Sequence, residues 1–245
     1  MDIKNLKNNL SLIGKALVIS FLVIDYIIEK KRPQIIYHKN ITHDLANVST
    51  GLTDKIFTSL ISVGSSPLFE KAEKNKTGTL QKIQIPAALK IIPALLIIDC
   101  FMYWWHRMNH RLPFLWRFHK FHHQDLYLNS TSAIRFHPAE IIISGLLRII
   151  VFIPLGIEKK QLAIYEKIFF PVITLHHSNI EISQGLDFFL RKFIVSPEMH
   201  RIHHSDKLSE AHTNFGSVLP YWDMVFGSYT SLPAENLQFG IPDDH

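Results

Sequence analysis

The sequence predicts an all-α fold, an integral-membrane helical bundle with a histidine-rich helical cap on its cytosolic side. Three observations lead to this prediction. Apolar residues make up 47% of the 245 residues and gather into long runs. Mean hydropathy is nevertheless only +0.10, as expected if about half of the chain is embedded in lipid and the rest is polar. Most of the 15 histidines fall into four short groups outside the longest apolar runs.

Charge and cysteine content exclude several classes of protein. The net charge of +5 is spread along the chain and forms no basic patch with interleaved aromatic residues, so nucleic-acid binding is not expected. Basic residues beside apolar runs, such as Lys30 and Lys31, suit contact with anionic lipid headgroups. The single cysteine, Cys100, excludes an internal disulfide and a cysteine-based zinc site. It lies in an apolar run and is interpreted as a small buried hydrophobic residue.

The apolar runs predict the membrane segments. The first run, residues 10–28, has the length of a spanning helix. It is longer than the core of a signal peptide and no small-residue cleavage site follows, so no cleavable signal is expected. Residues 52–69 are shorter and more polar, and the sequence leaves open whether they cross. Residues 87–105 predict a second span, which ends in an interfacial aromatic belt, Tyr103 to Trp105.

Two further apolar runs, residues 139–157 and 161–176, predict a helical hairpin. Neither is a clean span, because Arg148 interrupts the first and Glu166 and Lys167 interrupt the second, and a charge at the bilayer centre is costly. We expect a hairpin that dips into or crosses the membrane while facing protein. In either case the histidines before and after it lie on one face of the membrane.

The basic loop at residues 29–39 is expected in the cytoplasm. If residues 52–69 cross, the histidines are on the cytosolic face, and if they do not, the orientation inverts.

The histidine groups have the spacing of helical metal ligands. Positions i, i+3 and i+4 share one face of a helix, so a triplet at this spacing aims three imidazoles at one point. Pro113 predicts the start of a helix through the second group, and Ser196 with Pro197 is an N-cap signature for the last. The groups are HRMNH at 106–110, HKFHH at 119–123, HH at 176–177 and HRIHH at 200–204.

A shared metal site explains the grouping better than chance does, because two HxxHH matches would arise in about one such chain in a thousand. Burying many imidazoles without partners is costly, and clustering them as cations is repulsive. Eight or nine convergent histidines exceed the capacity of one ion, so two ions are expected. An all-imidazole set suits iron, zinc or copper, and ligand type does not choose among them.

In this order, around an apolar hairpin, the histidine groups resemble those of the fatty acid hydroxylase/sterol desaturase superfamily. The resemblance covers roughly residues 90–230. It also includes SAIRFHP at 132–138, HHSNI at 176–180, SPEMHRIHHS at 196–205, HTNFG at 212–216 and WDMVFG at 222–227. It implies a set of nine metal ligands, with His177 favoured over His176 by the motif: His106, His110, His119, His122, His123, His177, His200, His203 and His204.

The resemblance further implies two iron ions, which zinc can replace in purified protein, and O2-dependent hydroxylation or desaturation of a lipid. The chain would be one membrane domain, with N-terminal segments at 1–85, a catalytic region at 86–230 and a tail at 231–245. No dinucleotide fingerprint or haem-binding domain is evident, so electrons would come from a separate reductase or carrier. The alternatives are a membrane-embedded zinc hydrolase, although the HExxH motif is absent, and a non-catalytic metal-binding or transport protein.

Three residues near these groups are candidates for a catalytic role. We expect Asp99 either to orient a ligand histidine from another helix or to pair with a basic residue. His137 is interpreted as a ligand, a contact to a substrate proton or a structural hydrogen-bonding group. His212 is interpreted either as completing the site or as capping a turn beside Asn214 and Gly216. We expect Arg135 and Glu140 to form polar contacts near the site.

The remaining candidates are given structural roles. The isolated histidines His38, His43 and His245 are expected in solvent. Packing and turn roles that close the cap are expected for Trp222, Phe226 and Gly227.

Overall fold

The computed structural model describes residues 3–31, 42–231 and 237–241. Within these residues the chain is helical, and its only β feature is an isolated bridge between Ser205 and Phe239. This confirms the all-α prediction. The elements are α1 (Ile3–Lys31), α2 (His43–Lys74), α3 (Thr79–Lys82), α4 (Ile91–Arg111), α5 (Pro113–His123), the 3₁₀ helix η2 (Ser130–Ile134), α6 (Pro138–Leu155), α7 (Lys159–His177), α8 (Gln184–Leu190), α9 (Pro197–His203), α10 (Leu208–Ala211) and α11 (Tyr221–Val225).

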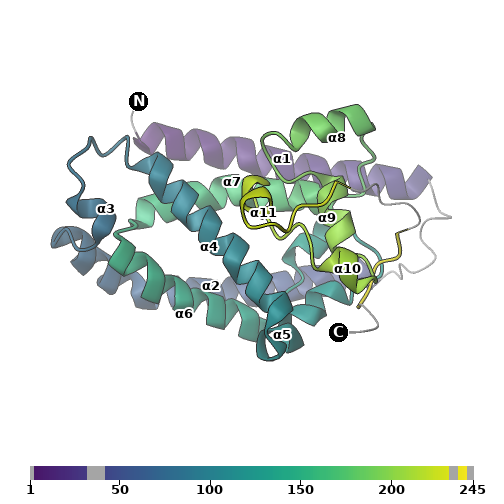
Figure 1. The fold of residues 1–245 in the computed structure, drawn as a ribbon, viewed down its shortest axis with the longest axis horizontal. Helices are drawn as coiled ribbons and strands as arrows, with labels where there is room; N and C mark the ends of the chain where they lie inside the picture. Colours follow the sequence, from purple (N-terminus) through teal and green to yellow (C-terminus); the bar gives the residue numbers. More distant parts are fainter. Residues whose placement is uncertain (1–2, 32–41, 232–236, 242–245) are drawn as a thin grey trace.

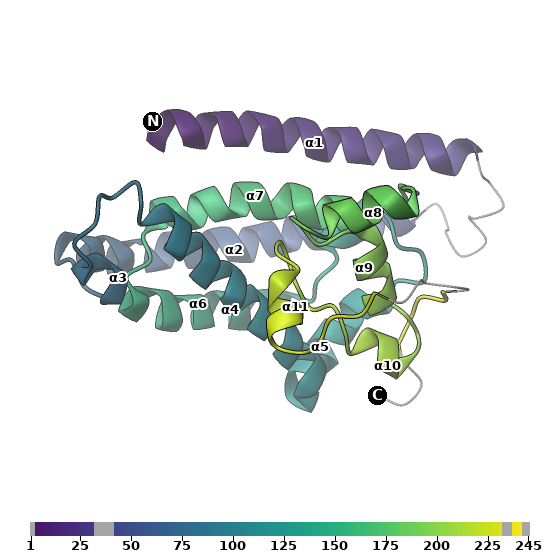
Figure 2. The ribbon, with the colours of Figure 1, turned by 45° about the horizontal axis from the view of Figure 1, so that its top comes forward.

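The long helices set the shape of the molecule. Helices α1, α2, α6 and α7 run along the long axis, and α4 crosses them diagonally (Figure 1). The short helices α5, α8, α9 and α10 gather toward the end opposite α3 (Figures 1 and 2). Helix α1 packs against α7, and α2 packs against α6. Although a short turn joins α6 to α7, each of these helices packs mainly against an earlier helix.

Glycines bring the paired helices close together. A Cβ at Gly14 of α1 would lie 3.2 Å from both the Lys167 carbonyl oxygen and the Pro171 Cγ of α7. A Cβ at Gly145 of α6 would lie 2.8 Å from the Ile61 Cδ1 of α2. Small residues at such contacts allow helix backbones to approach, as is common between helices in membranes.

Two glycines also close the end of the bundle near α3. Gly78 has φ +104° and Gly156 has φ +78°, a region of backbone space that side chains disfavour. A Cβ at Gly78 would lie 2.4 Å from the Gly156 Cα, so no side chain fits there. The contact fixes the turn after α2 against the turn between α6 and α7.

Among the described residues, two helices are long and apolar enough to cross a membrane: residues Asn8–Lys31 of α1, with mean hydropathy 2.0, and Pro138–Leu155 of α6, with mean hydropathy 1.9. The first matches the expected span at residues 10–28. The second lies in the run at residues 139–157, which was expected to dip into or cross the membrane, and it contains Arg148. Arg148 has partners on neighbouring helices, since its guanidinium donates to the Met102 sulfur at 3.1 Å and lies 4.0 Å from Glu166.

The apolar run at residues 87–105, which was expected to span the membrane, forms part of a helix that begins and ends later in the sequence. Helix α4 begins at Ile91 and continues to Arg111, through the first histidine group. It is not among the two candidate spans found in the described residues, because the polar side chains of its second half lower its hydropathy. Residues 52–69 are the middle of one 32-residue helix, α2. We conclude that two helices have the character of spans, and that α2 and α4 pack beside them.

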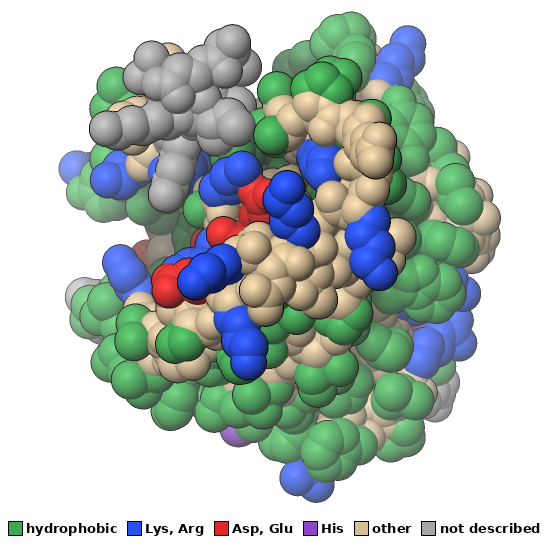
Figure 3. Space-filling model, turned by 90° about the vertical axis from the view of Figure 1, so that its left-hand side faces the viewer, with side chains coloured by type: hydrophobic (Ala, Val, Ile, Leu, Met, Phe, Trp, Pro, Cys, Tyr) green, Lys and Arg blue, Asp and Glu red, His purple; other side chains and the backbone are tan. Residues whose placement is uncertain are grey.

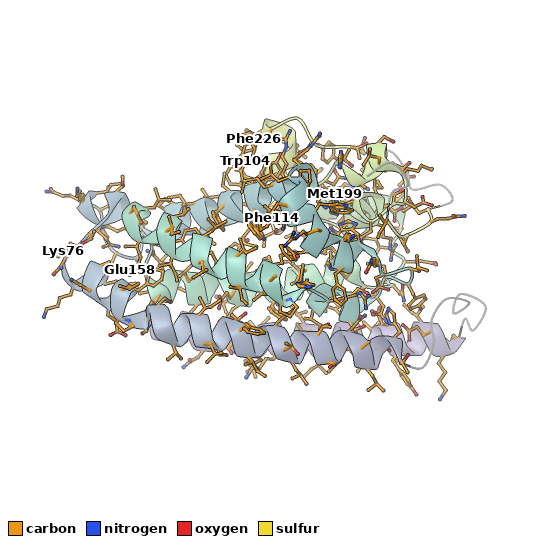
Figure 4. All side chains as sticks on the ribbon, turned by 90° about the horizontal axis from the view of Figure 1, so that it is seen from below. Lys76, Trp104, Phe114, Glu158, Met199 and Phe226 are labelled. Carbon is orange, nitrogen blue, oxygen red and sulfur yellow. The ribbon has the colours of Figure 1, made fainter. Side chains whose placement is uncertain are left out.

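The end of the bundle near α3 is charged. Figure 3 shows lysine, arginine and acidic side chains gathered at the centre of this end, with hydrophobic side chains around them. Lys159 pairs with Glu70 at 3.2 Å and Lys160 with Glu158 at 2.6 Å. Figure 4 places Lys76 and Glu158 at this end, and Met199, the residue before His200, away from it.

Candidate metal centre

The histidine groups sit on four helices that meet near the end opposite α3. His106 and His110 lie on α4, and the HKFHH group lies at the end of α5. His177 ends α7, and the HRIHH group lies on α9 with His204 as its C-cap. Pro113 begins α5, and the Ser196 side chain accepts a hydrogen bond from the Met199 N–H at the start of α9. The helices expected from these capping signals are therefore present.

The structure brings all nine expected ligands together, in two adjacent groups. Within each group, one ligand atom of every histidine lies within 4.8 Å of the others. The groups touch, since the rings of His123 and His204 stack with centroids 4.3 Å apart. The first group is His106, His110, His119, His123 and His203, and the second is His122, His177, His200 and His204.

Ring nitrogens converge in the second group at the spacing of metal ligands. The Nε2 of His177 lies 3.2 Å from that of His122 and 3.0 Å from that of His200, and the Nε2 atoms of His200 and His204 are 3.0 Å apart. An ion with bonds of 2.0–2.1 Å separates neighbouring ligand atoms by about 2.9–3.4 Å in tetrahedral or octahedral geometry. The second group therefore fits around one ion.

Backbone carbonyls fix which nitrogen faces inward. The Nδ1 of His122 donates to the Arg135 carbonyl oxygen at 3.1 Å, and the Nδ1 of His177 donates to the Ile173 carbonyl oxygen at 2.7 Å. With the proton on Nδ1, both Nε2 atoms present lone pairs to each other, and two acceptors cannot form a hydrogen bond. A cation between them removes this repulsion. The geometry thus favours a bound metal over a network of histidine hydrogen bonds.

The first group is oriented in the same way. The Nδ1 of His106 donates to the Phe215 carbonyl oxygen at 2.9 Å, and the Nδ1 of His203 donates to the Thr213 carbonyl oxygen at 2.8 Å. The Nε2 of His203 is buried and has no hydrogen-bond partner among the described residues. Outward hydrogen bonds of this kind fix the tautomer and ring orientation of metal-binding histidines.

Burial keeps the imidazoles neutral. It lowers the pKa of His122, His123, His200, His203 and His204 well below the usual 6.5, and neighbouring histidines lower it further. Neutral imidazole is the form that binds metals. The arrangement can therefore hold two cations without first losing protons at neutral pH.

Glu140 and Arg135 form the expected polar contacts beside the site. Glu140 accepts hydrogen bonds at 3.0 Å from the His119 Nδ1 and from the Asn109 side chain. The carboxylate thereby directs the His119 Nε2 toward the first group. The Nε of Arg135 donates to the Phe121 carbonyl oxygen at 3.1 Å, while its own carbonyl holds the ring of the second group's His122.

Among the described residues Asp99 contacts neither a histidine nor a basic side chain, so neither of its two expected roles is found. It is 2% exposed and accepts three hydrogen bonds, from the Tyr165 hydroxyl at 2.6 Å, the Trp222 indole at 2.8 Å and the Leu219 N–H at 3.1 Å. The carboxylate lies two turns before His106 on α4, so it joins α4 to α7 and to the C-terminal segment. The expected packing role of Trp222 agrees with this contact.

The other candidate histidines lie outside both groups. His137 is the N-cap of α6, where its Nδ1 accepts the Ala139 N–H at 3.1 Å. His212 follows α10, with its ring centroid 6.0 Å from that of His110. His176 is buried and stacks on His200 with centroids 3.9 Å apart, but it belongs to neither group. This arrangement agrees with the choice of His177 over His176.

His43 is not in solvent, which corrects a second expectation. Its ring forms ion pairs with Asp125 at 2.8 Å and Asp44 at 2.9 Å. Burial opposes the charge, but hydrogen bonds to these carboxylates prevail and raise the pKa of His43 to about 9. A lone histidine followed by an acid gives no signal of a partner 82 residues away. His38 and His245 lie outside the described residues.

Two acidic residues near the site were missed by the sequence analysis. Asp25 of α1 accepts the Ser130 N–H at 2.7 Å and the Asn179 N–H at 2.9 Å, beside the end of α7. Asp223 accepts the Phe215 and Gly216 N–H groups, each at 2.7 Å, and so holds the segment whose carbonyl orients His106. Asp25 is an isolated acid in an apolar run, and this isolation was the one sequence signal that it has polar partners in the fold.

Comparison with known proteins identifies the family. The model of the family described as fatty acid hydroxylase matches residues 91–228, more than half of the chain. The chain belongs to the fatty acid hydroxylase family. All nine convergent histidines lie inside the matched region, whereas Asp25 and His43 lie before it. No solved structure is significantly similar to the chain.

Several curated proteins are similar to this fatty acid hydroxylase family member. It is 32% identical over 157 residues to ornithine lipid hydroxylase OlsE of Rhizobium tropici, covering 61% of the chain and 44% of OlsE. It is 28% identical over 150 residues to human alkylglycerol monooxygenase, covering 60% and 32%. It is 26% identical over 151 residues to rat cholesterol 25-hydroxylase, covering 58% and 47%. The matched region spans less than half the length of each of these relatives.

Proposed function

We propose that the chain is a membrane-bound, O2-dependent lipid hydroxylase or desaturase with a dinuclear iron centre. The observation that carries this proposal is the convergence of nine histidines, eight of them buried, into two adjacent groups, each able to hold one ion. Family membership supports the reaction class, because the relatives are named as a lipid hydroxylase, an alkylglycerol monooxygenase and a sterol hydroxylase. The nine histidines are the proposed metal ligands.

When bound, a pair of iron ions would supply the activation of O2 for attack on an unactivated C–H bond. The protein's contribution is to hold and orient the ligands. Carbonyl oxygens and Glu140 hold five of the Nδ1–H groups outward, so that the Nε2 atoms of these rings would be free to bind metal: His106, His119, His122, His177 and His203. Because eight of the nine histidines are buried, the polypeptide also keeps bulk water from the centre. Exclusion of water prevents loss of the oxidant to side reactions.

The overall reaction requires electrons from outside the chain. Hydroxylation converts R–H, O2, two electrons and two protons into R–OH and water. Desaturation removes two hydrogens from adjacent carbons and forms two waters from the same O2, electrons and protons. We propose a separate reductase or electron carrier as the donor.

The substrate class follows from the surroundings of the site. Two candidate spans lie beside the histidine-bearing helices, so a molecule dissolved in the membrane reaches this protein more readily than a water-soluble one. A fatty acyl, sterol or related lipid is therefore proposed. His137 and His212, which stand near the groups without joining them, are proposed to contact the substrate or its protons.

We further propose a multi-pass protein with one membrane domain over residues 1–245. Its catalytic region is residues 86–230, and the metal centre is proposed to lie on the cytosolic face. The basic residues Lys30 and Lys31 end α1 on the side where the histidines gather, in agreement with the tendency of cytosolic loops to be basic.

Metal analysis tests the centre directly. Iron and zinc per chain are measured on detergent-purified wild type, on His203→Ala and His204→Ala, one from each group, and on His43→Asn as a histidine variant outside both. About two irons in the wild type and in His43→Asn, with loss in the other two, are expected. One zinc in the wild type, with no iron recovered on reconstitution, would overturn the di-iron proposal in favour of a zinc hydrolase.

The reaction is tested in cells that supply their own electron carriers. Lipids of a host expressing the wild type or His203→Ala are compared by mass spectrometry under ¹⁸O2. New hydroxylated lipids carrying ¹⁸O, or new double bonds, are expected only with the wild type. Identical lipids in both strains, with the protein folded and loaded with iron, would contradict the proposed activity.

A further inference from the structure

Helix α8 buries its charged side chains and exposes its large apolar ones. Its acid, Asp187, and the arginine that follows the helix, Arg191, are 3% and 4% exposed and form an ion pair on the inner side. The large apolar side chains point outward instead: Leu186, Phe188 and Phe189 are 47%, 43% and 55% exposed. A helix on a water-facing surface shows the opposite pattern, with its apolar side inward.

The apolar surface continues beyond the helix. Phe193, just after α8, is 56% exposed and packs edge-on against Phe189, with ring centroids 5.4 Å apart. The Tyr221 hydroxyl donates to the Lys192 carbonyl oxygen at 2.5 Å and so joins α11 to this segment. We call the combined surface the α8–α11 face, and it consists of Leu186, Phe188, Phe189, Phe193, Tyr221, Met224 and Val225, all at least 43% exposed.

The position of α8 indicates what covers this face. Along the long axis of the molecule, α8 lies level with the C-terminal half of α1 (Figures 1 and 2). The candidate span of α1 is 11% buried, and Ile19 and Val23 in that half are 60% and 50% exposed. If α1 crosses a bilayer, the α8–α11 face lies at a depth where lipid surrounds the protein.

The charges suit lipid as well. The acid of α8 is neutralised by its inward ion pair, and the exposed charge beside Phe193 is the cation Lys192. An outward aromatic and aliphatic surface flanked by a lysine is typical of segments that lie at the boundary between lipid headgroups and chains.

We infer that the α8–α11 face is embedded in the lipid bilayer, at the boundary of headgroups and acyl chains. The α8 part of this face lies in the segment that connects His177 to His200, so lipid would meet the chain between two histidines of the second group. Arg201 holds this connection to the site, because its guanidinium donates to the Ser178 and Ile180 carbonyl oxygens, each at 2.9 Å. The inference rests on the membrane location given under the proposed function.

Spin labels report the surroundings of single sites in the full chain. In a Cys100→Ser background, labels are placed at Phe189→Cys and, in a second protein, at Phe193→Cys. Ile19→Cys on α1 is the matched control for lipid, and Lys207→Cys at the exposed N-cap of α10 is the control for water. The proteins are reconstituted in vesicles of phosphatidylcholine and phosphatidylglycerol. Collision with O2, which concentrates in lipid, is compared with collision with a water-soluble nickel chelate.

We expect labels at residues 189 and 193 to match that at 19, with frequent O2 collisions and few nickel collisions. If labels at 189 and 193 collide with the nickel chelate as often as the label at 207, this inference is overturned. The membrane proposal stands in that case as long as the label at 19 is exposed to lipid. A water-exposed label at 19 would overturn both. Labels closed to both reagents would also overturn the inference and indicate a second protein copy on the face. Thermal unfolding of each variant confirms that it is folded.

Discussion

Replacing Asp99 tests whether one buried carboxylate joins helix α4, which carries His106 and His110, to the rest of the protein. Asp99→Ala removes the acceptor of three hydrogen bonds and leaves the Tyr165 hydroxyl, the Leu219 N–H and the Trp222 indole without it. A buried donor left unsatisfied costs about 1–3 kcal/mol, so the variant should lose roughly 3–6 kcal/mol of stability if some water enters. For a chain of this size that corresponds to a Tm lower by roughly 6–24 °C.

Thermal unfolding in detergent measures the loss, with Asp206→Asn, a change at a partly exposed acid, as the control. Asp99→Asn should lose less, because its amide still accepts from the indole and the Leu219 N–H. Metal content of folded Asp99→Asn should equal that of the wild type, since the carboxylate contacts no histidine. The reasoning is refuted if Asp99→Ala unfolds within about 2 °C of the wild type, or if folded Asp99→Asn has lost its metal.

Three further predictions concern a turn, an ion pair and a ligand contact. Gly78→Ala should destabilise the protein by at least about 1–3 kcal/mol, because Gly78 has a positive φ and contacts the opposite turn. Gly64→Ala, in open space on α2, should instead stabilise it by up to about 1 kcal/mol. Melting curves of the two variants test this difference. The raised pKa of His43, about 9 against the usual 6.5, contributes stability that is complete below pH 6.5 and is lost as the pH rises through 9. His43→Asn should therefore flatten the fall of Tm between pH 6.5 and 9, and an unchanged slope would show that another group is responsible. Glu140→Gln should weaken metal binding about 10- to 100-fold, because the carboxylate fixes the His119 ring; chelator competition measures it, and equal affinity would count against this role.

The sequence predicted the metal centre better than the membrane helices. Ligand spacing is a local property of the sequence. The spacing i, i+3 and i+4 on α5 and α9 is enough to predict that the histidines of each triplet lie on one face of their helix. Capping by Pro113 and Ser196 is local too. The assignment of the histidines to two groups was not predictable, because it depends on how four helices meet. His123 and His122 are adjacent in sequence and fall into different groups.

Long-range partners account for the errors. The contacts of Arg148 with Met102 and Glu166, on other helices, could not be read from the sequence. Asp99 was singled out as a candidate, but its partners come from residues 66 to 123 positions later. The isolation of His43 in sequence likewise hid its pairing with Asp125. A polar residue in an apolar context signals a partner without identifying it.

The contacts of Asp25 bear on the order in which the protein is assembled. Its two donors, the N–H groups of Ser130 and Asn179, follow it by 105 and 154 residues. Helix α7, against which α1 packs, also emerges from the ribosome long after α1. If α1 crosses the bilayer as proposed, it would enter as a single helix during synthesis and dock only when the hairpin of α6 and α7 is complete. In that topology, closure of the protein around its histidines would be a late event in biogenesis, and substitutions at Asp25 would act on maturation and yield before they act on turnover.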